Sequence, residues 1–243
     1  MKENTYHSYS FRNCVINGDT ITMDAAMSGK FIEVGSRMWL MAPAPASIQM
    51  DDNRDMKFYN INVYGGGNIR ENFTKGTGTV YDGVKLTPGP RPAGATKDRM
   101  ISVASDGVHV TQCENGPSFT NCTFNSCADD GVNIQGFYYK VFSRSGKTML
   151  IAPKWDCGLE EGETVTFYSN ADWAKIGTAK IVSFRKFKDP SKTAAIRKLY
   201  TGMDQTIGDD TLLYEITFDK ELPVSAGDNM DGTDRINKNV SFK

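Results

Sequence analysis

Short segments of this chain alternate apolar and polar residues with a period of two, which is typical of β-strands. Three of them share a pattern in which an aromatic residue precedes Asn by two positions and apolar residues follow. These segments are 10–16, 57–63 and 118–124. Repeated short strands with turns rich in Gly, Asn and Asp indicate a stacked solenoid, with equivalent residues about 4.8 Å apart. We therefore expect the aromatic rings to stack inside and the Asn side chains to form a ladder of amide hydrogen bonds.

A second repeat relates the segment DGVHV at 106–110 to the segment DGVNI at 130–134, 24 residues further along. This offset suits one coil of a parallel β-helix, so the two segments should pair on adjacent strands of one sheet. His109 and Asn133 have the same parity and should point outward on one face. The side chains expected in the shared core are Phe11, Phe58, Phe119, Val108, Val110, Val132 and Ile134. Residues 58–64 and 81–86 also fit such strands.

The short period is lost after Gly136. Longer apolar segments follow, separated by turns and charged stretches, and they favour an antiparallel sheet or small barrel inserted between coils. The aromatic repeat begins again at the end of the chain, so we expect the sequence to stop inside a coil. The pattern predicts an all-β protein, a right-handed parallel β-helix with an inserted antiparallel β subdomain. Its expected parts are coils at 1–136, a barrel-like insertion at 137–238 and the start of a further coil at 239–243.

The composition of the chain argues against two classes of function, nucleic-acid binding and membrane spanning. The 28 basic and 29 acidic residues leave no basic surplus for nucleic acid, and no apolar run approaches the roughly 20 residues of a membrane span. Five Cys cannot all pair, and no spacing suggests zinc, so we expect them to be mostly small buried side chains. We expect an extracellular or periplasmic protein whose signal is removed or absent; a cytoplasmic location and a homo-oligomer are left open.

Three carboxylates, those of Asp106, Asp129 and Asp130, come at the start of the two stacked strands. Adjacent strands bring them to about 5 Å of one another at the backbone. Carboxylates this close cannot all ionise independently, which favours one protonated acid beside ionised partners. Glycosidic cleavage needs this combination, because an acid protonates the leaving oxygen while another carboxylate activates water or attacks the anomeric carbon. Gly107 and Gly131 should leave room for a sugar. The alternative is a turn or a calcium site.

The two motifs resemble those of β-helical glycoside hydrolases with a pectin-lyase-like fold. Polygalacturonases of family 28 have an Asn-Thr-Asp-Gly strand followed one coil later by Asp-Asp. The chain is more similar to the family 110 α-1,3-galactosidases, which remove galactose from blood-group-B-type glycans, most clearly over residues 98–136. Those enzymes also carry a β-rich insertion directly after the second motif. The resemblance implies an inverting hydrolase with Asp106, Asp129 and Asp130 as its acidic cluster, and Glu160 of the insertion as a fourth catalytic candidate.

The leading hypothesis is an inverting, exo-acting glycosidase without a cofactor, acting on an α-galactose-containing glycan or polysaccharide. His109 and Asn133 are the candidates for binding the substrate. A polysaccharide lyase or epimerase, which often uses Ca²⁺, and a non-catalytic carbohydrate-binding β-helix are the alternatives. Tyr138, Trp155 and Trp173 could stack on a sugar ring, although aromatic side chains more often lie in a core.

Overall fold

The computed structural model describes residues 15–22, 35, 37, 39, 45–154, 158–200 and 211–243, and it divides the chain into two compact units, 1–40 and 41–243. In the first unit, β1 (Val15–Asn17) and β2 (Thr20–Thr22) form an antiparallel hairpin. The expected core position of Phe11 lies outside the described residues. Among the residues described, no helix is long and apolar enough to cross a membrane.

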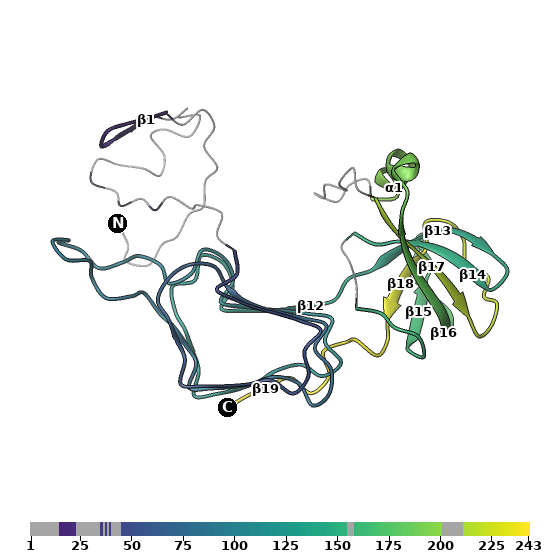
Figure 1. Cartoon of the computed structure of the whole chain (residues 1–243), viewed down its shortest axis with the longest axis horizontal. Helices are drawn as coiled ribbons and strands as arrows, with labels where there is room; N and C mark the ends of the chain where they lie inside the picture. Colours follow the sequence, from purple (N-terminus) through teal and green to yellow (C-terminus); the bar gives the residue numbers. More distant parts are fainter. Residues whose placement is uncertain are drawn as a thin grey trace. The chain divides into compact units, whose positions relative to one another are not determined.

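The second unit begins with short strands arranged in stacked coils (Figure 1). Successive strands belong in turn to three different sheets, and the chain then returns to the first sheet. They are β3 (Ile48–Asp51), β4 (Lys57–Tyr59), β5 (Asn62–Val63), β6 (Ile69–Asn72), β7 (Val80–Asp82), β8 (Lys85–Leu86), β9 (Val108–Thr111), β10 (Ser118–Thr120), β11 (Thr123–Phe124) and β12 (Val132–Gln135). Equivalent strands pair in parallel, which gives the sheets β3-β6-β9-β12, β4-β7-β10-β19 and β5-β8-β11. The expected all-β architecture and its parallel sheets are confirmed.

The register of these sheets follows the sequence repeats. Val108 pairs with Val132 and Val110 with Ile134, as predicted from the 24-residue offset, and His109 pairs with Asn133. Val108 and Val110 are fully buried, and the remaining described members of the expected core pack in the same cluster.

The expected aromatic stack is also present between the parallel sheets. Phe58, Tyr81, Phe119 and Phe242 lie one above another, with ring centroids 5.4, 5.1 and 5.0 Å apart in that order. Each such pair contributes about 0.5–1.5 kcal/mol beyond the burial of its surface. The aromatic repeat in the sequence therefore marks a column that joins neighbouring coils.

The Asn positions of the repeat have a backbone role. Asn60, Gly83 and Asn121 occupy the same turn in successive coils with φ values of 54°, 67° and 53°. This left-handed conformation favours Asn and Gly over other residues. The expected amide ladder is interrupted, because the middle coil carries Gly83, where a Cβ would lie 2.5 Å from Oδ1 of Asn60.

A carboxylate is also buried in the core of the parallel sheets. Glu71 of β6 is fully buried, and its oxygens accept hydrogen bonds from Thr79 Oγ1 at 2.6 Å and Tyr81 OH at 2.9 Å. Burial, together with the negative charge of Glu71, raises the pKa of Tyr81. These bonds satisfy a polar group that would otherwise destabilise the core.

The predicted barrel follows β12. Six antiparallel strands close on themselves in the order β13-β14-β17-β16-β15-β18, so no edge is left open. They are β13 (Tyr139–Ser145), β14 (Thr148–Ala152), β15 (Thr164–Tyr168), β16 (Lys175–Lys188), β17 (Leu212–Phe218) and β18 (Asn229–Gly232). A short 3₁₀ turn, η1 (Pro190–Lys192), and helix α1 (Thr193–Leu199) follow β16. The antiparallel pairing expected after Gly136 is confirmed; the exact domain bounds stay a prediction.

The chain then returns to the parallel sheets. β19 (Ser241–Phe242) pairs in parallel with β10 and places Phe242 beside Phe119. The side chain of Asn237 accepts a hydrogen bond from Cys113 N at 2.9 Å and donates one to Gln135 O at 3.1 Å. One amide thus connects the return segment to the end of the strand from which the barrel departs.

Candidate functional site

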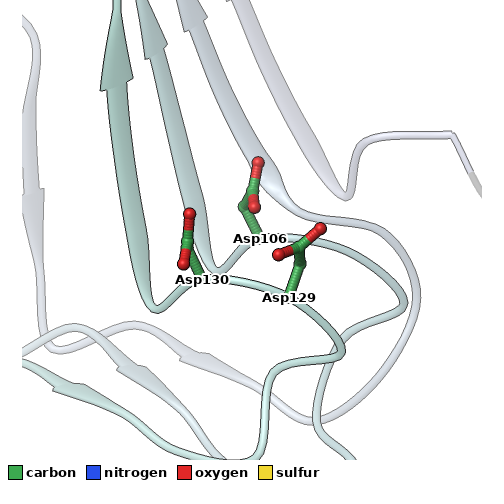
Figure 2. Close-up of side chains that lie close together, drawn as sticks. All are labelled: Asp106, Asp129 and Asp130. Atoms are coloured by element: carbon green, nitrogen blue, oxygen red, sulfur yellow. The ribbon is translucent and has the colours of Figure 1, made fainter. Parts of the chain in front are cut away.

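Three aspartates meet where two adjacent strands begin. Asp106 precedes β9, and Asp129 and Asp130 precede β12. Each offers a carboxylate oxygen, and these oxygens all lie within 4.8 Å of one another (Figure 2). Asp106 is only 5% exposed, whereas Asp129 and Asp130 face solvent. The structure therefore brings together the three acids that the repeat predicted.

Backbone contacts between the two turns hold the acids in place. Gly107 N donates to Asp130 O at 2.7 Å, and Val108 N donates to Gly131 O at 3.1 Å. A Cβ on Gly107 would lie 2.4 Å from Gly131 O, so glycine is required there for the close approach of two backbones. The expectation that Gly107 leaves room for a sugar is replaced by this packing role. A Cβ on Gly131 would make an ordinary contact, 3.4 Å from Phe124 Cβ.

A short hydrogen-bonded chain leads from the buried acid to the outer face of the sheet. His109 Nδ1 lies 2.6 Å from Asp106 Oδ2, and Gln135 Nε2 lies 2.7 Å from His109 Nε2. With Gln135 as donor, Nε2 of the imidazole accepts and Nδ1 carries the proton that is donated to Asp106. His109 thus orients an acid, and Gln135 orients His109.

The outward face of the same sheet carries a polar row. Arg70 of β6, His109 of β9 and Asn133 of β12 are in register on successive strands. Arg70 is exposed, His109 and Asn133 are half-buried, and Arg70 gives the row its positive charge. Sequence analysis identified His109 and Asn133 but missed Arg70. The coil between β6 and β9 is longer than the 24-residue repeat, and only the alternation in 69–72 indicates that Arg70 points outward.

Glu160 lies elsewhere. Its carboxylate contacts Lys75 Nζ at 2.5 Å, and Lys75 also contacts Asp52 at 3.1 Å. Lys75 lies beyond the end of β6, and Asp52 directly follows β3. The three aspartates instead precede their strands. The length of a four-residue strand, about 13 Å, therefore separates the Lys75 ion pairs from the acidic cluster. Burial lowers the pKa of Lys75, but its hydrogen bonds to Glu160 and Asp52 outweigh this effect and raise it. Asp52 thus takes part in an ion pair at the end of β3 that is remote from the three aspartates.

Glu160 also borders an open cavity of about 370 Å³. The lining residues are Asp52, Gly158, Leu159, Glu160, Glu161, Phe184 and Lys186. The predicted contribution of Glu160 to the acidic cluster therefore has no support in its contacts, and the cluster is best described by Asp106, Asp129 and Asp130.

The cluster has two chemical capacities. A group of carboxylates with one buried, hydrogen-bonded member can hold a proton donor beside a charged partner. The same oxygens are ligands of the kind that Ca²⁺ prefers. Both ring nitrogens of His109 are already bonded, so within the polar row Arg70 and Asn133 are the residues that offer hydrogen-bonding groups to a molecule lying along the sheet.

No family model matches the chain, and no curated protein matches it. The membership in the family 110 α-1,3-galactosidases, or more distantly the family 28 polygalacturonases, that the motifs suggested is therefore corrected. The physical reason lies in the motifs themselves. Asp-Gly at the start of stacked strands serves turn formation and close backbone approach, as Gly107 does, so the motif alone does not demonstrate common descent.

Proposed function

We propose that this chain is a glycoside hydrolase whose parallel sheets form a right-handed β-helix. Sheets visited in a fixed order by short coils support a helix, and right-handed crossovers between parallel strands are the rule. The observation that carries the activity is the group of three carboxylates within 4.8 Å, one of them buried and bound to a histidine.

The roles follow from the environment of each acid. Asp106 accepts the His109 ring N–H, a bond that favours negative charge, so we assign it as the nucleophile or base. Asp129 and Asp130 are exposed and reach the substrate more freely, so one of them is the proton donor. Arg70 and Asn133 bind sugar hydroxyl groups along the sheet.

The spacing of the acids bears on stereochemistry. An inverting pair is separated by about 6.5–9.5 Å, whereas a retaining pair is separated by about 5–5.5 Å. One oxygen of each acid lies within 4.8 Å of the others, but each carboxyl group has a second oxygen, so this bound is compatible with either class. The sequence motifs led us to expect inversion, and the anomeric configuration of the first product, followed by NMR, decides between them.

The test of hydrolysis uses a panel of nitrophenyl glycosides and natural glycans, with α-galactosides among them. On a substrate that the wild type cleaves, Asp106→Asn, Asp129→Asn and Asp130→Asn should each lower kcat, by about 10²–10⁴-fold where the acid is catalytic. Asp82→Asn, on another parallel sheet, is the matched control and should keep wild-type turnover. Full activity in all three cluster variants would show that the site is assigned wrongly.

A Ca²⁺-dependent polysaccharide lyase or epimerase is the second candidate. The cluster suits a cation, and Arg70, in register with His109, supplies the kind of base that removes a C5 proton from a uronic acid. A lyase forms an unsaturated sugar that absorbs ultraviolet light and loses activity when Ca²⁺ is chelated. Substrate binding that persists in Asp130→Asn without any turnover by the wild type would instead indicate a binding protein.

A further inference from the structure

Three aromatic rings gather on the outside of the barrel, away from its core. They belong to Tyr138, just before β13; Tyr168, at the end of β15; and Trp173, in the turn between β15 and β16. The ring of Tyr138 lies 4.9 Å from Trp173 and 6.1 Å from Tyr168, with steep interplanar angles of 69° and 89°. Tyr138 is 45% exposed and Trp173 is 51% exposed. We call these three residues the aromatic platform.

The turn that carries Trp173 is fixed by hydrogen bonds. Trp173 N donates to Ser169 O at 3.0 Å, and Ser169 N donates to Ala174 O at 2.9 Å. Ala174 N donates to the Asp172 carboxylate at 3.1 Å. Trp173 nevertheless has φ of 61°, an unfavourable conformation for a bulky residue. The turn thus holds a half-exposed indole ring against Tyr138 at a cost in backbone strain.

The charges around the platform restrict what it can bind. Asp231 of β18 faces Tyr138; burial, followed by the negative charge of Asp231, raises the pKa of the Tyr138 hydroxyl. Asp172 lies beside Trp173 in the turn, and Lys175 of β16 is in register with Tyr168. Lys140 Nζ donates to Asn170 Oδ1 in the same turn at 2.7 Å, and Asn170 N donates to the Asp228 carboxylate at 2.9 Å. Three carboxylates and two ammonium groups give no positive excess, so the platform does not suit a polyanion. Carboxylates beside aromatic faces do suit a ligand with many hydroxyl groups and apolar C–H surfaces.

We propose that Tyr138, Tyr168 and Trp173 form a binding site for the pyranose rings of a neutral glycan chain. The ring faces stack on the C–H surface of the sugar, and Asp231 and Asp172 accept hydrogen bonds from its hydroxyls. The site is separate from the acidic cluster and does not depend on the chemistry proposed there. Tyr138 follows Asp130 by eight residues, so the chain places the two within about 29 Å at full extension.

The test is affinity electrophoresis of the whole chain in gels that contain a neutral galactan, glucan or mannan, with polygalacturonate as the anionic counterpart. The wild type should be retarded by at least one neutral polymer and not by polygalacturonate. Trp173→Gly and Tyr138→Ala should weaken binding by about tenfold or more, and Trp173→Phe should retain much of it. Tyr59→Ala and Tyr64→Ala are matched controls, because these tyrosines are 56% and 49% exposed on the parallel coils.

The variant Trp173→Gly separates binding from folding. Glycine tolerates positive φ, so this change should keep or raise the thermal midpoint while removing the ring. Wild-type retardation of Trp173→Gly and Tyr138→Ala, or binding of polygalacturonate in preference to every neutral polymer, overturns the proposal. So does a wild type that none of the polymers retards. A protein that binds through the platform but cleaves no glycoside would instead refute the hydrolase and leave this site standing.

Discussion

The substitution Gly107→Ala tests whether neighbouring coils really meet backbone to backbone at the acidic cluster. The new Cβ would lie 2.4 Å from Gly131 O and 3.1 Å from Cys127 Sγ. Gly131 O cannot withdraw without lengthening its 3.1 Å hydrogen bond from Val108 N. Overpacking of a well-packed interior costs about 1–3 kcal/mol, and a backbone neighbour that cannot yield places this change near 3 kcal/mol.

The assay is thermal unfolding followed by circular dichroism. For a protein of this size each kcal/mol shifts the midpoint by about 2–4 °C, so we expect Gly107→Ala to lower it by about 6–12 °C. Gly131→Ala is the matched control in the equivalent motif. Its Cβ makes only a 3.4 Å contact, and the loss of unfolded-state freedom should leave it unchanged or about 0.4–1 kcal/mol more stable. Equal midpoints for the two variants would refute the stacking described for these turns.

Two further predictions concern buried groups. Arg235 is 2% exposed and pairs with Glu163 and with two backbone carbonyls, so Arg235→Ala should destabilise the protein by about 3–5 kcal/mol. Arg185→Ala, which breaks an exposed pair, should cost less than about 1 kcal/mol, and similar thermal shifts for both would contradict the argument. Burial raises the pKa of the Cys113 thiol to about 12, so iodoacetamide at mildly alkaline pH should label it only after unfolding, as mass spectrometry can establish. Rapid labelling of native Cys113 would show that the coil core is open.

The parts that the sequence predicted well are those encoded within one coil. The 24 residues between Asp106 and Asp130 equal the chain length needed to return to the same sheet, and alternation then decides which side chains are inside. Together these rules predicted the pairing of Val108 with Val132 and the meeting of the three aspartates. The loss of the short period after Gly136 likewise predicted antiparallel strands.

The parts that sequence analysis missed depend on contacts between distant segments. Glu160 is held by Lys75, 85 residues away, and no local pattern encodes that pair. The alternation along β6 places Glu71 inside, but a buried acid is acceptable only because the hydroxyl groups of Thr79 and Tyr81 donate hydrogen bonds to it. Trp173 was expected more in a core than on a surface, because aromatic content alone does not reveal a turn that points a ring into solvent. Short Asp-Gly motifs, finally, report turn geometry more reliably than ancestry.

The amide of Asn237 has a consequence for the origin of this architecture. It bonds both to Gln135, where the chain leaves the coils, and to Cys113, on the coil beside it. The two ends of the barrel segment, at Gln135 and Asn237, are therefore held close together, as the two ends of a short loop would be. Once the barrel has formed, the pairing of β19 with β10 requires little more chain closure than an ordinary turn does. Because the junction fixes both ends, we expect that another domain with similarly spaced ends could replace the barrel. The aspartates would not be disturbed, since they lie at the opposite end of β12.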